Sequence, residues 1–339
     1  MRVTTSLALC CNEKIFLRGK IMSNLYISMY HYTRDLVHSR YPEIKGLDVN
    51  LFKQQIDFFC SNFSPVTMEQ VIDSVYNKTP LPQNAILLTF DDGYIDNYTY
   101  AFPILEEAGI QGSFFIPGKT FAEHKLLDVN KIHYILASGN IKLLMKDVLE
   151  RMDFYRGNEF QFPENDILLN EYAVANRFDS KEVIFVKRML QTVLPESLRT
   201  CIASELFSKY VGVSEEQLAY ELYMTEEQIA TLKRHGMFIG IHGYDHYWLG
   251  KLSIGQLHQD ISAALDVMDK YIDKSRWVMN YPYGNYNEDV LSFIKEQGAC
   301  LGLTTEVRIA KLENDNKFTL PRFDCNDFPP KSEIYRRFE

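Results

Sequence analysis

The 339-residue sequence lacks several features that mark common classes of protein. It has no run of about 18 apolar residues, so no membrane-spanning helix is expected. Lys and Arg do not cluster and the formal net charge is −9, which argues against a nucleic-acid-binding surface. The six cysteines show no Cys-x-x-Cys spacing, so we expect free thiols in a reducing compartment rather than a disulfide framework.

The N-terminal residues also lack the features of an export signal. Residues 7–11 form an apolar run, but it is short and is soon followed by Glu13 and Lys14. A secretory signal has a longer apolar stretch and a cleavage site with small residues. We therefore expect residues 1–22 to be an N-terminal extension and the protein to be cytoplasmic.

Two polar motifs are present, and each directly follows an apolar run that is typical of a buried strand. Residues 86–90 precede Asp91 and Asp92, and residues 237–241 precede a segment that contains His242 and His246. Adjacent strand residues point to opposite sides, so the two carboxylates are suited to different tasks. One carboxylate and two histidines make a three-ligand metal site with room for water.

Each motif has an alternative explanation when it is taken alone. Asp and Gly favour turns, so Asp-Asp-Gly after a strand is often only a turn. Two histidines four residues apart are often surface or half-buried side chains. The occurrence of both motifs at the ends of apolar strands favours the metal site.

Strand and helix patterns alternate along most of the chain. Strands are predicted at residues 25–30, 86–90, 112–116, 237–241, 277–281, 300–304 and 318–320. Such alternation implies a parallel sheet, and seven strands favour a closed or nearly closed α/β barrel. Periodicity alone does not distinguish this barrel from an open, doubly wound sheet.

The candidate functional residues share one position relative to these strands. They follow the carboxyl ends, which carry the active site in α/β barrels. The residues concerned are His31, Asp91, Asp92, His242, His246, Tyr283 and Arg322.

The alternation stops in the middle of the chain, where the patterns are mainly helical. We therefore expect a barrel formed by residues 23–121 and 225–339, interrupted by a helical insertion at residues 122–224. Insertions after barrel strands often form lids or partner surfaces, so a role in substrate selection is one interpretation. A purely structural cap is the other.

These motifs resemble the polysaccharide deacetylases, the NodB-homology domains of carbohydrate esterase family 4. Residues 89–93 (Thr-Phe-Asp-Asp-Gly) and the His242–His246 pair match the first two family motifs. Weaker similarity lies at residues 224–229, 281–284 and 320–322. The resemblance implies a distorted (β/α)7 barrel, here with a long, mainly helical insertion.

The resemblance also implies a role for each matched residue. Asp92, His242 and His246 would bind one divalent metal ion, with zinc favoured and cobalt or nickel as alternatives. That ion would polarise the acetamide carbonyl and hold the oxyanion, with a backbone N–H near Tyr283 as the second donor. Asp91 would be the general base, tuned by its neighbours.

The chain departs from the family pattern in its later motifs. Asn280 stands where the family commonly has an arginine that partners the catalytic Asp. We predict that Arg322 replaces it, and an ion pair of Arg322 with Asp324 or Asp327 is the alternative. The fourth motif has no clear match, and the histidine of the fifth is missing. His31 is the candidate acid, unless it is a half-buried side chain bonded to a strand carbonyl.

Substrate contacts are predicted at four residues, and plain packing is the alternative for the aromatic ones. Tyr281 and Tyr283 are candidates for a pocket wall, Trp248 for stacking on a sugar, and Asn280 for a polar contact.

The predicted function is removal of an N-acetyl group from a sugar or glycan. A cytoplasmic location favours a precursor of surface-polysaccharide synthesis, although fold analogy says little about substrate. One alternative is an O-acetyl esterase or another amidase that uses the same site. Another is a non-catalytic carbohydrate-binding protein.

Overall fold

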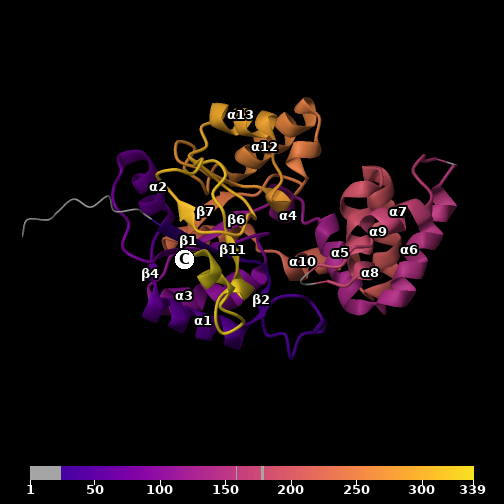
Figure 1. Cartoon of the computed structure of the whole chain (residues 1–339), viewed down its shortest axis with the longest axis horizontal. Coiled ribbons are helices and arrows are strands. Elements are labelled where there is room, and N and C mark those ends of the chain that lie inside the picture. The colour runs from indigo at the N-terminus through magenta and orange to yellow at the C-terminus, as the bar shows by residue number, and fades with distance from the viewer. Residues whose placement is uncertain (1–23, 158, 177–178) are drawn as a thin grey trace, which may run out of the picture.

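The computed structural model describes residues 24–157, 159–176 and 179–339 (Figure 1). The expected extension at residues 1–22 therefore lies outside the described residues, as do Cys10 and Cys11. The four described cysteines are free thiols. Among the described residues, no helix has both the length and the apolar character needed to cross a membrane.

A strongly curled parallel sheet forms the centre of the molecule. Its parallel strands, in spatial order, are β1 (Asn24–Tyr30), β5 (Ala85–Phe90), β6 (Gly112–Ile116), β7 (Phe238–Ile241), β8 (Val278–Asn280) and β9 (Leu301–Leu303). After β9 the chain bridges in parallel from Leu303 to Leu320, and β11 (Phe323–Asp324) then pairs in parallel with β1. This last segment joins the two edges, which confirms the distorted seven-stranded barrel.

Four short strands lie beside this sheet or apart from it. Within the sheet, β4 (Ser64–Pro65) pairs with β5, and β10 (Ala310–Lys311) pairs antiparallel with the start of β1. A separate small sheet consists of β2 (Thr33–Arg34) and β3 (Leu47–Asp48).

The apolar runs of the strands arise because both faces of the sheet are buried. In β5, Leu87 packs inside the barrel with Ile27 and Leu303. Its neighbours Leu88 and Phe90 point the other way and pack into the layer beneath the outer helices. All six residues of β5 are buried, so the polar side chains that follow the strand lie at the end of a rigid element.

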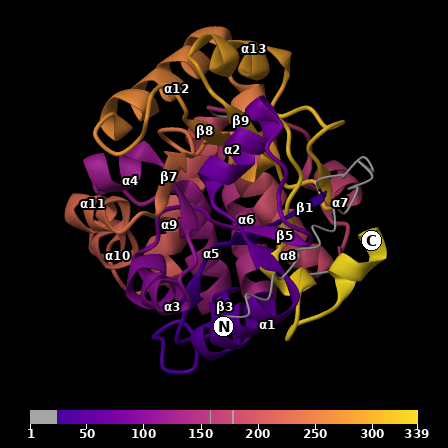
Figure 2. The same ribbon diagram turned by 90° about the vertical axis from the view of Figure 1, so that its left-hand side faces the viewer.

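Helices surround the sheet (Figure 2). They are α1 (Val49–Asn62), α2 (Met68–Asn77), α3 (Phe102–Ala108), α4 (Gly118–Ala122), α11 (Glu226–Arg234), α12 (Ile254–Met268) and α13 (Glu288–Glu296). A capping box begins α11: the Thr225 side chain accepts from Gln228 N, and the Gln228 side chain accepts from Thr225 N.

Residues 122–224 contain helices that lie to one side of the barrel (Figure 1). They are α5 (Asp128–Ser138), α6 (Ile141–Tyr155), α7 (Asn165–Tyr172), α8 (Lys181–Arg188), α9 (Glu196–Tyr210) and α10 (Glu215–Leu222). We call residues 122–224 the helical segment. It has its own apolar core, to which the barrel loops add Tyr32, Tyr41 and Tyr94. The helical segment thus packs on the barrel at the loops that follow β1 and β5, and its exact domain limits stay a prediction.

Candidate active site

The loop after β5 places two carboxylates in different surroundings. Asp91 N donates to Tyr30 O at 2.9 Å, which continues the pairing of β5 with β1 by one residue. Asp92 and Gly93 then take left-handed conformations, with φ of 72° and 69°. A Cβ on residue 93 would lie 2.8 Å from Ile116 Cγ2, so glycine is required where the chain turns. This turn separates the side chains of Asp91 and Asp92.

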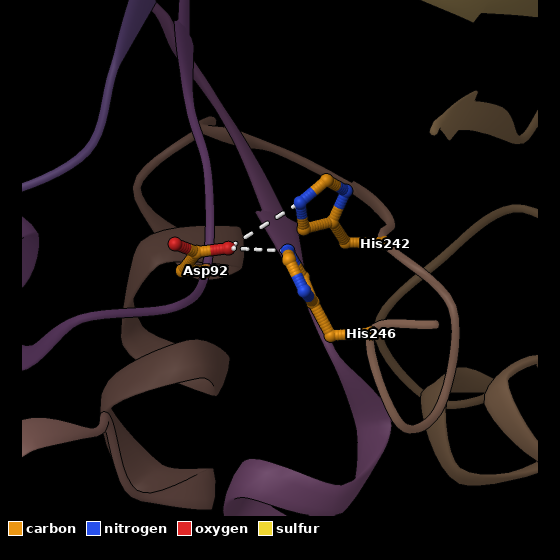
Figure 3. Close-up of side chains that lie close together, drawn as sticks. All are labelled: Asp92, His242 and His246. Atoms are coloured by element: carbon orange, nitrogen blue, oxygen red, sulfur yellow. Dashed lines mark ion pairs between the residues drawn. The ribbon is translucent and has the colours of Figure 1, made fainter. Parts of the chain in front are cut away.

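Asp92, His242 and His246 form a compact buried cluster. Asp92 Oδ1 lies 3.3 Å from His242 Nε2 and 3.2 Å from His246 Nε2. The three ligand atoms all lie within 4.8 Å of one another. Figure 3 shows one carboxylate oxygen facing a ring nitrogen of each histidine. The structure thus brings together the three residues predicted as metal ligands.

The protonation pattern of this cluster fits a cation. His242 Nδ1 is 2.7 Å from Asn280 O, and because a carbonyl only accepts, Nδ1 carries a proton and Nε2 is the ring nitrogen that faces Asp92. Burial lowers the pKa of His246 despite the nearby Asp92 carboxylate, so this ring is neutral. Asp92 Oδ1 is buried without a hydrogen-bond partner among the described residues. One carboxylate oxygen and two imidazole nitrogens that converge in this way are the donor set of one divalent metal ion.

The loop that carries both histidines is held by a residue that sequence reasoning missed. The buried carboxylate of Asp260, on α12, accepts from Tyr244 N at 3.0 Å and from Asp245 N at 2.9 Å. These bonds fix the backbone between His242 and His246. A single Asp within an amphipathic helix gives no sequence signal of this contact.

Asp91 forms a bidentate ion pair with Arg322. Nη1 donates to Asp91 Oδ1 at 2.8 Å and Nη2 donates to Oδ2 at 2.9 Å, and both residues are buried. Burial alone would raise the pKa of Asp91, but the guanidinium outweighs it, so the pKa is lowered and the carboxylate is ionised at neutral pH. The predicted contact between Arg322 and Asp91 is therefore confirmed.

The remaining donors of Arg322 are also occupied. Nε donates to Thr304 O, Nη1 to Thr89 Oγ1 and Nη2 to Asn280 Oδ1, at 2.8, 3.0 and 2.8 Å. A guanidinium has five N–H groups, so none is left for the alternative partners, Asp324 and Asp327. Asn280 is fully buried, and it holds Arg322 through its side chain and His242 through its carbonyl. Asn280 therefore links the Arg322–Asp91 ion pair to His242. It does not face substrate, contrary to the sequence-based expectation.

His31 lies at the rim of the site. Its Nε2 is 3.9 Å from Asp91 Oδ2, and its side chain is 37% exposed. The imidazole is thus near the expected base and open to solvent, as a residue that exchanges protons needs to be. Its role as an acid stays a prediction.

A cavity of about 970 Å³ adjoins His246 and extends between the barrel and the helical segment. Trp248 and Tyr283 line it on the barrel side, with their rings stacked at 4.5 Å. Tyr283 also meets the His246 ring edge to face at 4.7 Å. Residues of α5, α9 and α10 line the opposite side, among them Lys131, Arg199 and Glu216.

Tyr281 lies in the core and does not line this cavity. Its side chain is fully buried, and its hydroxyl donates to Phe318 O at 2.8 Å. The expectation that Tyr281 forms a pocket wall is therefore wrong, because the residue after β8 points inward while Tyr283 points to the cavity. Plain packing, the alternative stated for it, is what the structure shows.

Comparisons with known proteins agree with this geometry. The family model described as polysaccharide deacetylase matches residues 78–161 and 205–301. YxkH of Bacillus subtilis, a polysaccharide deacetylase by name, is 29% identical over 91 residues, which are 27% of this chain and 33% of that protein. The poly-β-1,6-N-acetyl-D-glucosamine N-deacetylase of Escherichia coli K12 is 31% identical over 81 residues, or 24% of this chain and 12% of that protein. The chain thus spans a third or less of these curated relatives.

Solved structures match over most of the chain. The deacetylase PplD of Streptococcus pyogenes superposes with a TM-score of 0.58 and 17% identity, covering 94% of this chain and 99% of that one. IcaB of Ammonifex degensii gives a TM-score of 0.53 and 17% identity, covering 91% and 95%. At such identities the likeness establishes the fold alone.

Proposed function

Because this chain belongs to the polysaccharide deacetylase family, we propose that it is a metal-dependent hydrolase that removes an N-acetyl group from a sugar or glycan. One observation carries the proposal. The unpartnered Asp92 Oδ1 faces one imidazole nitrogen each of His242 and His246, beside an ionised carboxylate, Asp91, in one buried site. When bound there, a divalent ion, zinc in our proposal, supplies Lewis acidity and lowers the pKa of water.

The side chains around this cluster supply the proton transfers of an amide hydrolysis. Asp91 takes a proton from the attacking water, since Arg322 holds it ionised and in one orientation. His31, which is 3.9 Å from Asp91 Oδ2 and partly exposed, donates a proton to the leaving amine. Amide cleavage requires such an acid because an amine anion is a poor leaving group.

The cavity supports a sugar substrate larger than the acetamide itself. Its volume of about 970 Å³ exceeds what one acetyl group needs, and the stacked Trp248 and Tyr283 offer an aromatic face next to His246. The Escherichia coli relative is named for action on poly-β-1,6-N-acetyl-D-glucosamine, so oligomers of that sugar are the first compounds to test. We extend the proposal to a cytoplasmic precursor of surface polysaccharide, as the sequence features favour.

Release of acetate tests the proposal directly. Metal-loaded protein is incubated with N-acetylglucosamine oligomers and, in parallel, with an O-acetylated sugar, and free acetate is measured. We expect acetate from the N-acetyl substrates, and none from Asp92→Ala. Acetate from the ester alone would identify an O-acetyl esterase. A metal-bound protein that binds the oligomers and releases nothing would identify a carbohydrate-binding protein.

A further inference from the structure

A chain of buried hydrogen bonds connects the metal-binding cluster to the helical segment. The Tyr94 hydroxyl donates to Asp92 Oδ2 at 2.6 Å, the carboxylate oxygen that does not face the histidines. Asn130 Nδ2, on α5, donates to the Tyr94 hydroxyl at 2.6 Å. Tyr94 and Asn130 are both fully buried. Asn130 thus acts on Asp92 through one intermediate side chain.

Only one assignment of donor and acceptor is possible for these two hydrogen bonds. An ionised carboxylate can only accept, so the single Tyr94 hydroxyl proton points to Asp92 Oδ2. The Tyr94 oxygen must then accept from its second neighbour, which requires the NH₂ group of Asn130 on that side. The bond from Tyr94 to the Asp92 carboxylate therefore sets the orientation of the Asn130 amide.

The other bonds of Asn130 agree with that orientation. Its second N–H donates to the Tyr32 hydroxyl at 2.9 Å, and its Oδ1 accepts from the Tyr223 hydroxyl. The Tyr223 oxygen in turn accepts from Leu127 N at 3.1 Å. The side-chain amide of Asn130 thus has an acceptor for both protons and a donor for its oxygen.

The far end of this network closes on His133. The Tyr32 hydroxyl accepts from Asn130, so its own proton is directed to His133 Nδ1, 3.2 Å away. Burial lowers the pKa of His133 to about 3, so the ring is neutral and Nδ1 can accept. Every hydroxyl in the network therefore has a defined donor and acceptor, and a network that is fully satisfied in this way is rigid.

Backbone contacts also join the two segments of the chain that carry Tyr94 and Tyr223. Tyr94 and Tyr223 form an antiparallel bridge, and Met224 N donates to Gly93 O at 3.0 Å. The end of the helical segment is thus fastened to the same turn that carries Asp92.

We propose that Asn130 is a positioning residue for the metal centre. It orients the Tyr94 hydroxyl, the hydroxyl fixes Asp92 Oδ2, and Oδ1 is thereby left to face the cation with His242 and His246. This inference rests on the proposed function only in that a divalent ion binds the cluster. It gives the helical segment a part in building the metal site, in addition to lining the cavity.

Two substitutions at position 130 disturb the network in different ways. Asn130→Leu removes both donors, so the Tyr94 hydroxyl loses the neighbour that orients it. Asn130→Asp keeps the shape but offers only acceptors when ionised, so it competes with Asp92 for the one Tyr94 proton. Losing an outer partner of a metal ligand typically weakens metal binding by about 10- to 100-fold.

The experiment measures the dissociation constant for Co²⁺ by calorimetry on metal-stripped protein. We expect about tenfold weaker binding for Asn130→Asp and Asn130→Leu. The matched control is Asn140→Asp, since Asn140 is exposed and caps α6 away from the network. It should bind Co²⁺ like wild type. Thermal unfolding shows whether each variant is folded.

A double-variant cycle separates positioning from general stability. If Asn130 acts through Tyr94, then Asn130→Leu combined with Tyr94→Phe binds Co²⁺ no more weakly than Tyr94→Phe alone. If instead both single changes weaken binding independently, the losses add and the inference is overturned. Wild-type affinity in the Asn130 variants, with only a lower unfolding temperature, would also overturn it.

A third variant tests the inference if the substitutions at position 130 prevent folding. Should the Asn130 variants fail to fold, Tyr223→Phe, which removes the hydroxyl that donates to Asn130 Oδ1 and accepts from Leu127 N, is expected to weaken Co²⁺ binding about threefold. Unchanged affinity there would count against the inference.

Protein that binds Co²⁺ but releases no acetate refutes the deacetylase proposal and leaves the role of Asn130 intact. Wild type that binds no divalent ion refutes both.

Discussion

The two sides of the cavity are built on different principles. On the barrel side, the reactive groups follow buried strands and are held by bonds to backbone atoms, as His242 is by Asn280 O. On the helical side, Lys131 makes ion pairs with Asp128 and Glu215, and Arg199 projects from α9. A barrel keeps its chemistry at strand ends, whereas side chains on surrounding elements are free to vary with the substrate.

This contrast predicts that loss of a polar residue at a barrel strand end affects catalysis, whereas loss of a side chain that only lines the cavity, such as Trp248 or Arg199, affects substrate binding. Asn130 is the exception, because its hydrogen bonds reach Asp92 through Tyr94. The four predictions that follow test the contrast in order of decreasing effect.

The largest effect is expected from loss of a metal ligand. Asp92→Ala and His242→Ala each remove one of three ligands from a buried cluster, so bound metal should fall from about one ion per chain to none. Acetate release should fall by at least about 1,000-fold, because several kcal/mol of transition-state stabilisation are lost. Elemental analysis and acetate assay check this. A chelator should likewise remove the metal and the acetate release from wild type. Retention of one ion per chain in either variant would contradict the assignment of the ligands.

The next effect is expected at Arg322. Lys in its place keeps a charge but has at most three donors, so the bidentate hold on Asp91 is lost and kcat should fall roughly 100-fold. Arg322 lowers the pKa of Asp91, so its loss raises that pKa. Because the base acts only when ionised, the acidic limb of the pH–kcat profile should move to higher pH.

A nearby arginine provides the control for this change. Arg308 is a surface residue that pairs with Glu306 and Asp315, so Arg308→Lys should leave the profile as in wild type. An Arg322→Lys profile with an unmoved acidic limb would show that Arg322 has only a structural role.

A smaller effect is expected where the aromatic wall meets substrate. Trp248→Ala removes the ring that stacks on Tyr283 at the cavity, and one aromatic contact is worth about 0.5–1.5 kcal/mol. KM should therefore rise by up to about tenfold, with kcat nearly unchanged. Steady-state kinetics on a glycan oligomer measure both. A fall in kcat at constant KM would place Trp248 with the catalytic residues instead.

The smallest effect is expected on the helical side. Arg199 lines the cavity, and single surface charges contribute at most about 1 kcal/mol, so Arg199→Ala should change KM by about fivefold or less. The difference should vanish at high salt, because exposed charges are screened. Arg151→Ala, in the same segment but outside this cavity, is the control. A change in kcat for Arg199→Ala would contradict the prediction that the helical side affects only substrate binding.

Part of the structure followed from local sequence alone. Apolar runs identified six of the seven barrel strands, since strands buried on both faces need continuous apolar sequence. The seventh was predicted at residues 318–320, but there only Leu320 bridges to Leu303, and the strand that closes the barrel against β1 is β11. The Asp-Asp-Gly turn and the His pair identified the metal cluster, because each directly follows such a strand.

Other parts followed only from tertiary structure, for a physical reason. Arg322 had three carboxylates as candidate partners, and only closure of the barrel by residues 320–324 brings it to Asp91. Tyr281 and Tyr283 are two residues apart in one motif, yet one packs in the core and the other lines the cavity. Asn130 is an ordinary helical asparagine until α5 packs on the β5 loop.

Sequence by itself therefore determined which elements form and where the metal-binding residues lie, because strands, turns and caps depend on neighbours along the chain. Tertiary structure alone decided which side chains from distant elements meet: Arg322 with Asp91, Asn280 with Arg322, and Asn130 with Tyr94. Those contacts depend on closure of the barrel and on packing of the helical segment against it. Both are properties of the packed core, and neither produces a pattern in the local sequence.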